Sequence, residues 1–97
     1  MITRLVKLNL KPDKAEEFEL VFNQNKPLID SFEGCQTTNL FKISGVNSQY
    51  FTISYWQSEE HLENYRASAL FKSTWSRVKP LFAAKAQAFT LTSVIPL

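Results

Sequence analysis

The side chains best suited to chemistry are two neighbours, Tyr65 and Arg66, in a segment with helical spacing. A phenol hydroxyl or a guanidinium can hydrogen-bond a substrate phenolate and stabilise its negative charge. Further aromatic residues are candidates to line an apolar cleft for a flat aromatic ligand: Phe22, Tyr55, Phe71, Trp75 and Phe89. Tyr65 and Trp75 lie ten residues apart, on different helical turns, so they can grip such a ligand from two sides. The alternative is that these aromatic side chains simply fill the core.

The single histidine and the single cysteine offer little further chemistry. His61 follows Ser58 in the first turn of a predicted helix and is expected to face water. Cys35 follows a turn with no base in sight, so we expect a small buried residue and not a nucleophile. With only one of each residue, neither a catalytic triad nor a zinc or iron site can be built. We therefore expect no metal and no cofactor.

Length, composition and charge restrict the class of protein. With 97 residues the chain is predicted to form a single domain over 1–97, and 44% hydrophobic residues suffice for a packed core. The net charge is +2, and the basic residues are scattered from Arg4 to Lys85 without a run, which argues against nucleic-acid binding. Arg4 and Lys7 interrupt the first apolar stretch, so no signal peptide or membrane span is expected, and a cytoplasmic location is the default.

The first half of the chain predicts a strand, a helix and a turn. Residues 2–10 alternate between apolar and polar types, as a strand does. A helix is predicted from Pro12–Asp13, with Asp13 as a possible cap and Pro27 expected to kink it or end its first part. The apolar stripe of this helix recurs at three- and four-residue steps: Ala15, Phe18, Val21, Phe22, Asn25, Ile29 and Phe32. Gly34 fits the turn out of the helix.

The second half predicts a hairpin, two helical segments and a last strand. Strands at 35–43 and 49–56 enclose a loop at 44–48. Ser58 and Ser68 are predicted to cap two helical segments, Pro80 to bend or end the second, and 87–95 to form the last strand. The order β-α-β-β-α-β predicts an α+β, ferredoxin-like fold in which helices cover one face of a four-stranded antiparallel sheet.

The other face of this sheet is expected to be rich in threonine and partly apolar. The residues assigned to it are Leu5, Thr38, Leu40, Thr52, Ser54, Trp56, Thr90, Thr92 and Val94. A second copy of the sheet would cover such a face, which predicts a homodimer. The alternative is a solvated face with a few exposed apolar groups.

Three stretches, taken together, resemble the antibiotic biosynthesis monooxygenase family. Residues 32–35 (FEGC) resemble the family's "xPGC" turn, and residues 55–60 (YWQSEE) its strand-ending Trp and acidic helix start. Residues 65–71 (YRASALF) are similar to its "H-x-x-S-x-H-F" helix segment, and the order of elements agrees over nearly all of the chain. The resemblance implies a dimeric α/β barrel. The family includes cofactor-independent monooxygenases, quinol monooxygenases and haem-degrading enzymes.

This chain departs from the family at the histidines. Tyr65 and Leu70 stand where many members have the two histidines of the helix segment. The iron-binding His of the haem-degrading branch falls on Trp75, and its catalytic Asn on Val6, so haem degradation is not expected. The resemblance implies a cofactor-independent monooxygenase of a small aromatic, hydroquinone-like or polyketide-like substrate. The other hypotheses are a non-catalytic dimeric module that binds a small apolar ligand, and an isomerase on the same scaffold.

Overall fold

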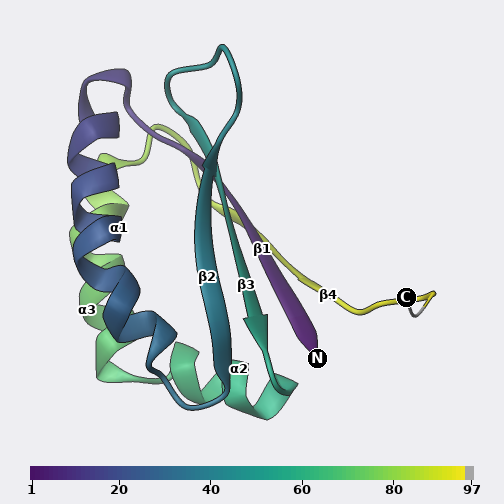
Figure 1. Ribbon diagram of the computed structural model, residues 1–97. Helices are drawn as coiled ribbons and strands as arrows, with labels where there is room; N and C mark the ends of the chain where they lie inside the picture. Colours follow the sequence, from purple (N-terminus) through teal and green to yellow (C-terminus); the bar gives the residue numbers. More distant parts are fainter. Residues whose placement is uncertain (96–97) are drawn as a thin grey trace.

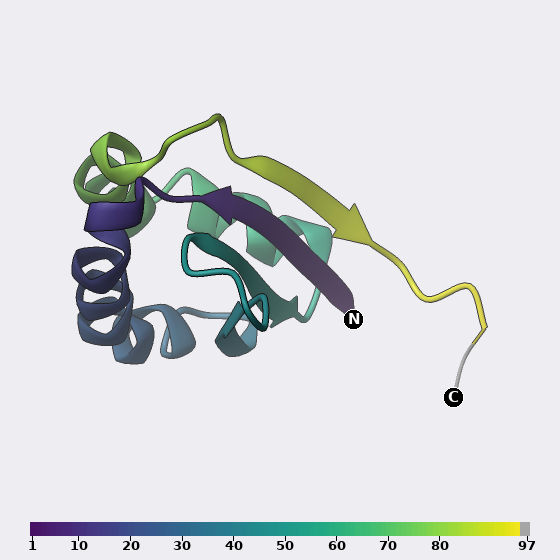
Figure 2. The ribbon, with the colours of Figure 1, turned by 90° about the horizontal axis from the view of Figure 1, so that it is seen from above.

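A computed structural model describes residues 1–95 and contains one four-stranded antiparallel sheet with helices packed on one side (Figure 1). Its elements are β1 (Ile2–Asn9), the short 3-10 turn η1 (Pro12–Lys14), α1 (Ala15–Asp30), β2 (Cys35–Lys42), β3 (Gln49–Trp56), α2 (Glu59–Arg66), α3 (Ala69–Val78), η2 (Lys79–Leu81) and β4 (Gln87–Leu91). The strand order is β2-β3-β1-β4, and each neighbouring pair is antiparallel. This confirms the predicted ferredoxin-like α+β fold. Figure 2 shows α1 and α3 side by side against the sheet.

Helix α1 begins and ends differently from the prediction. It starts at Ala15, after η1, and no side chain caps it, so Asp13 does not serve as its cap. The helix also continues through Pro27 to Asp30, so the proline does not end its first part. The carbonyl that loses its donor belongs to Asn23, and both residues are exposed, so water can hydrate that carbonyl.

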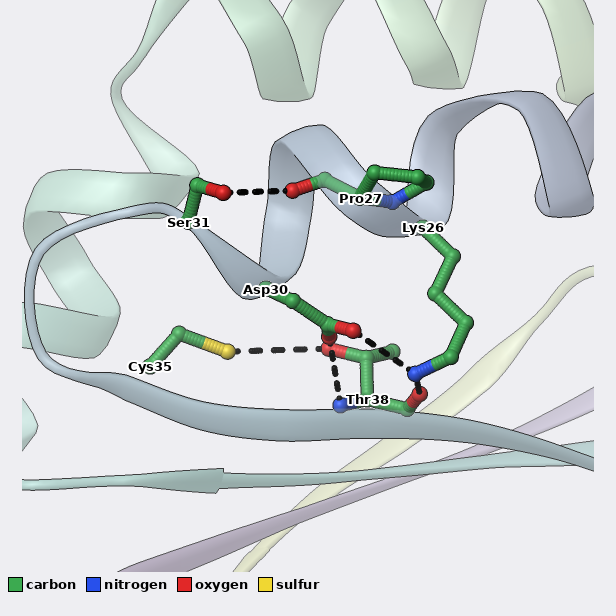
Figure 3. Close-up of polar contacts among 6 residues, drawn as sticks. All are labelled: Lys26, Pro27, Asp30, Ser31, Cys35 and Thr38. Carbon is green, nitrogen blue, oxygen red and sulfur yellow. Dashed lines mark hydrogen bonds and ion pairs between the residues drawn. The ribbon is translucent and has the colours of Figure 1, made fainter.

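The end of α1 is tied to the edge strand β2 by a polar cluster (Figure 3). The Lys26 Nζ lies 2.7 Å from Asp30 Oδ2 and also donates to the backbone carbonyl of Thr38. The Thr38 N–H donates to Asp30 Oδ1 at 2.9 Å. The backbone groups of an edge strand are a template for unwanted strand pairing unless they are covered. Lys26 and Asp30 satisfy both backbone groups of Thr38 and so tie the end of α1 to the middle of β2.

Turn residues confirm the predicted hairpin and the exit from α1. Gly34 has a φ of 87°, a conformation that favours glycine, and leads directly into β2. Gly45, in the loop between β2 and β3, has a φ of 80°. β3 has the predicted bounds, and β2 ends one residue earlier than predicted.

The cross-strand register reverses the predicted assignment of the two sheet faces. Leu8 on β1 pairs with Tyr50 on β3, and both are buried under the helices. Alternation from this pair places nearly all residues predicted for the free face on the helix side instead: Thr38, Leu40, Thr52, Ser54, Trp56 and Thr90. Of the predicted set, only Leu5 lies on the face without helices. We call this face the open face, and its apolar residues are Leu5, Phe41, Phe51, Ile53, Tyr55, Phe89 and Leu91.

Strand β4 is shorter than predicted. The last pair of its ladder joins Leu91 to Thr3, and β1 has only one more residue, Ile2, with which the chain beyond Leu91 could pair. The predicted strand residues Thr92, Val94 and Ile95 therefore lie outside the sheet. In Figures 1 and 2 this segment leaves the sheet and extends away from the helices.

Candidate functional site

A cavity of about 260 Å³ lies between the helix-facing side of the sheet and the helices. Its sheet wall comes mainly from Arg4, Val6, Leu8, Thr38, Thr52, Ser54 and Ala88, and its helix wall mainly from Phe18, Phe22, Ile29, Leu62, Tyr65, Arg66, Phe71, Thr74, Trp75 and Val78. An apolar cavity of about 150 Å³ is enough to admit benzene. The space therefore suits one aromatic ring with substituents.

A continuous row of aromatic rings runs from Trp56, the last residue of β3, along the helix wall. Tyr65 stacks on Trp56, with ring centroids 4.9 Å apart and planes 26° apart. The edge-to-face contacts continue from Tyr65 to Phe71 at 5.2 Å, from Phe71 to Trp75 at 5.6 Å and from Trp75 to Phe82 at 5.5 Å. Such contacts stabilise aromatic pairs beyond the burial of their area. The row fixes the shape of the wall and leaves flat ring surfaces against which an aromatic ligand can pack.

Helix caps position this row, as the sequence predicts. The Ser58 Oγ accepts the backbone N–H of His61 at 3.2 Å at the start of α2. The Ser68 Oγ accepts the backbone N–H of Phe71 at 3.1 Å at the start of α3. Each cap starts its own helix, so Tyr65 near the end of α2 and Phe71 in the first turn of α3 meet edge-to-face across the break between the two helices.

Tyr65 presents a hydroxyl that stays protonated. Burial, followed by the nearby Cys35, raises the pKa of Tyr65 to about 12. Within residues 1–95 its hydroxyl makes no hydrogen bond. The group is thus a hydrogen-bond donor over the whole neutral pH range, and none of the described residues competes for it.

The sheet wall adds small hydroxyl groups at the floor of the cavity. Trp56 is fully buried, and its Nε1–H donates to Ser54 Oγ at 2.9 Å. Thr38, another residue of this wall, has its Oγ1 3.7 Å from the Cys35 Sγ. Burial raises the pKa of the Cys35 thiol, which does not line the cavity. The floor is therefore neutral, and Cys35 is a protonated, half-buried thiol.

Two arginines mark one end of the cavity, near the start of β1 and the end of α2. The Arg4 Nη1 donates to Thr90 Oγ1 across the β1–β4 pair at 2.8 Å. The Arg66 Nη1 lies 3.0 Å from Glu63 Oε1. Burial and the Arg66 charge lower the pKa of Arg4, and Glu63 partly opposes this. Arg4 was not among the predicted site residues, although its place between Ile2 and Val6 on one face of β1 is visible in the sequence.

The structure brings together most of the predicted site residues. Tyr65, Arg66, Trp75, Phe22 and Phe71 all line the cavity. The prediction that Tyr55 and Phe89 also line this cleft is wrong. Tyr55 pairs with Thr3 and Phe89 with Leu5, so both lie on the open face.

His61 also differs from expectation. It is half-buried and does not face water freely. Its ring packs so closely over Gly34 that a Cβ there would lie 2.3 Å from His61 Cγ, and its Nδ1 is 2.7 Å from Ser58 Oγ. His61 therefore supports the turn into β2 and lies outside the cavity.

The charge chemistry of the cavity follows from its lining. Arginines are its only ionisable lining residues besides Tyr65, and no carboxylate or imidazole lines it in the described part of the chain. Across residues 1–95, no group of three or more His, Cys, Asp or Glu side chains gathers as a metal site would require. In the same residues, no helix has the length and apolar character to cross a membrane. The cavity can bind, enclose and electrostatically stabilise an anionic aromatic, but it supplies no strong base.

Solved structures share this architecture. A candidate antibiotic biosynthesis monooxygenase from Caulobacter crescentus has a TM-score of 0.89 at 23% identity, covering 97% of this chain and 90% of that one. A mutant form of SnoaB, a cofactor-independent oxygenase from Streptomyces nogalater, has a TM-score of 0.85 at 17% identity, covering 99% and 95%. No curated protein matches the sequence.

The sequence itself matches a family model. The model for the antibiotic biosynthesis monooxygenase family matches residues 1–76, which include β1 to α2 and most of α3. The matched part includes Tyr65, Arg66 and Trp75. The chain belongs to the antibiotic biosynthesis monooxygenase family.

Proposed function

We propose that this protein is a cofactor-independent monooxygenase that oxidises a small aromatic substrate of the hydroquinone class. The observation that carries the proposal is the cavity, which combines a row of aromatic rings, the Tyr65 hydroxyl and a cationic end. The similarity to SnoaB, which is a cofactor-independent oxygenase, supports the reaction class. The volume of about 260 Å³ favours a single-ring substrate over a fused polyketide-like one.

The chemistry requires little from the protein. A hydroquinone loses a proton, and the resulting phenolate transfers an electron to O₂. Combination of the two radicals forms a carbon–oxygen bond. Cleavage of the O–O bond then leaves one oxygen atom on the ring and the other in water. The substrate supplies all the electrons, so the products are a hydroxyquinone and water, and no external reductant is consumed.

The side chains assist the first of these steps. The Tyr65 hydroxyl donates a hydrogen bond to the phenolate oxygen, and the Arg66 charge favours the ionised substrate. No carboxylate or imidazole lines the cavity in the described residues, so solvent water accepts the substrate's proton. The aromatic wall holds the ring and excludes water while the radical pair exists.

Oxygen uptake tests this function. The protein, dialysed against a chelator, is supplied with a panel of hydroquinones in an oxygen electrode, and the rate is compared with that of free substrate. Saturable uptake that requires protein is expected for single-ring hydroquinones, with smaller rates for fused-ring substrates. Saturable binding of these compounds without protein-dependent uptake would contradict the oxygenase and leave a ligand-binding module.

The proposed assembly is a homodimer formed through the open face. Phe41, Phe89 and Leu91 are 51%, 50% and 43% exposed there, and Leu5 and Ile53 lie between them. A sheet face with this much exposed apolar area is stabilised by a partner. We further propose a cytoplasmic location, because a reducing compartment keeps the unpaired Cys35 as a thiol.

A further inference from the structure

The two arginines at the end of the cavity are an unusual pairing for an otherwise neutral, apolar site. Arg4 lies near the start of β1, and Arg66 is the last residue of α2, so two distant segments bring positive charge to one place. Both side chains line the cavity, whose other lining residues in the described chain carry no formal charge at neutral pH.

The local charges do not cancel. Arg66 has Glu63 as an ion-pair partner on the exposed side of α2. The Arg4 side chain is half-buried, and the one hydrogen bond of its guanidinium within residues 1–95 goes to the neutral hydroxyl of Thr90. Together, Arg4, Arg66 and Glu63 therefore carry one net positive charge at this end of the cavity. Two guanidinium groups close together repel each other, and an anion bound between them would remove that repulsion.

The number of donors indicates what that anion is. A guanidinium presents its N–H donors in a planar fork that matches the two oxygens of a carboxylate. A phenolate offers one oxygen, which the Tyr65 hydroxyl can already engage inside the cavity. Two guanidinium groups offer more donors than the single phenolate oxygen can accept. A carboxylate, in contrast, can give one oxygen to each guanidinium.

We propose that Arg4 and Arg66 form a carboxylate subsite, and that the substrate is an aromatic acid whose ring lies along the row from Tyr65 to Trp75. The inference rests on the proposed function, because it names the substrate class of the same cavity. It assigns Arg4 a specificity-determining role and predicts that hydroxylated benzoates are preferred to unsubstituted hydroquinones.

The test compares two ligands of the same shape and different charge. Benzoate and benzamide are titrated separately by isothermal titration calorimetry at neutral pH into the wild-type protein and into Arg4→Gln, Arg66→Gln and Arg77→Gln. Arg77 is the matched control, because its Nη2 donates to Gln24 Oε1 at 3.0 Å on the exposed surface and it does not line the cavity. Circular dichroism checks that each variant is folded, and Arg4→Lys keeps the charge if Arg4→Gln is unstable.

We expect the wild type and Arg77→Gln to bind benzoate about ten- to a hundredfold more tightly than benzamide. Arg4→Gln should lose most of this preference and Arg66→Gln part of it, while benzamide affinity stays within about threefold. Arg4→Lys should keep part of the preference. Equal affinities in the wild type, no saturable binding of benzoate, or a preference that survives in both glutamine variants would overturn the proposal.

This test is independent of turnover, because benzoate has no ring hydroxyl to oxidise. A charge preference that depends on Arg4, together with no oxygen uptake from any hydroxylated benzoate, would leave the subsite in place and refute the oxygenase alone. Oxygen uptake that is equally fast with hydroquinone and with dihydroxybenzoate would refute the subsite alone.

Discussion

Replacing Tyr65 by phenylalanine removes one hydroxyl from the cavity and keeps the ring that organises its wall. The ring stacks on Trp56 at 4.9 Å and meets Phe32 and Phe71 edge-to-face at 5.4 and 5.2 Å, and all three contacts survive the change. The hydroxyl makes no hydrogen bond within residues 1–95. The free energy of unfolding should therefore change by less than about 1 kcal/mol.

The effect on catalysis should be much larger. A hydrogen bond to a charged group contributes about 1.5–3 kcal/mol, and about 1.4 kcal/mol corresponds to a tenfold change. If Tyr65 donates to the substrate phenolate, kcat/KM for oxygen uptake should fall roughly ten- to a hundredfold in Tyr65→Phe. Tyr55→Phe is the matched control, because it deletes the same hydroxyl from the open face and should keep the wild-type rate.

The assay pairs oxygen uptake with thermal unfolding of the wild type and both variants. A loss of activity accompanied by an unchanged melting temperature supports a hydroxyl that touches substrate. A Tyr65→Phe variant with wild-type kcat/KM would refute the reasoning, and a strongly lowered melting temperature would assign the hydroxyl to packing.

Four further predictions concern the scaffold and the assembly. Gly34→Ala should destabilise the fold by about 1–3 kcal/mol in urea unfolding, because its φ is 87° and its Cβ would meet the His61 ring. Adding His61→Ala should restore only part of this loss, and full recovery would show that backbone strain contributes nothing. Asp30→Ala should cost about 1–3 kcal/mol in the same assay by leaving the Thr38 N–H unpaired, and an unchanged midpoint would refute its bracing role. Phe89→Glu should give a monomer in light scattering where the wild type is a dimer, and a dimeric variant would exclude the open face as the interface. The free energy of unfolding should fall as pH rises from 10 to about 12, because the Tyr65 phenol ionises at lower pH in the unfolded chain than in the folded one. The fall should be smaller in Tyr65→Phe, and equal losses in both proteins would contradict the raised pKa of Tyr65.

The sequence predicted the elements well because each has a strong local signal. Alternation identified the strands, and hydroxyl side chains followed by acidic residues identified the start of α2 at Ser58. The end of β4 was predicted wrongly because it depends on how far the neighbouring strand β1 extends. The β-branched residues Thr92, Val94 and Ile95 favour a strand, but β1 has only one more residue, Ile2, beyond the Thr3 that pairs with Leu91.

The faces of the sheet were harder to predict, and this error moved two site residues. Alternation shows that Tyr55 and Trp56 point in opposite directions, but not which one meets the helices. The more apolar face of β3 was taken as the core. The register shows instead that Thr52 and Ser54 face the helices, where they line a cavity and need not pack as a dense core does. The apolar residues of β3 lie on the open face instead, which a partner chain would cover.

Arg4 shows that a site residue is hard to predict when its partner lies far away in the sequence. Its type and position were visible in the sequence, but its importance depends on Arg66, which lies far along the chain and approaches only through the fold. Tyr65, Arg66 and Phe71 could be selected because they share one short segment, whose caps at Ser58 and Ser68 set their directions.

Isotope labelling of the product tests the central claim, that the cavity is the place where a small aromatic is oxidised by O₂ without a cofactor. Chelator-treated protein is incubated with dihydroxybenzoate under ¹⁸O₂, and the product is analysed by mass spectrometry beside Tyr65→Phe and Tyr55→Phe. The account predicts one labelled oxygen atom in the product, formed rapidly by the wild type and Tyr55→Phe and slowly by Tyr65→Phe. Product without label, or label formed equally by all three proteins, would contradict it.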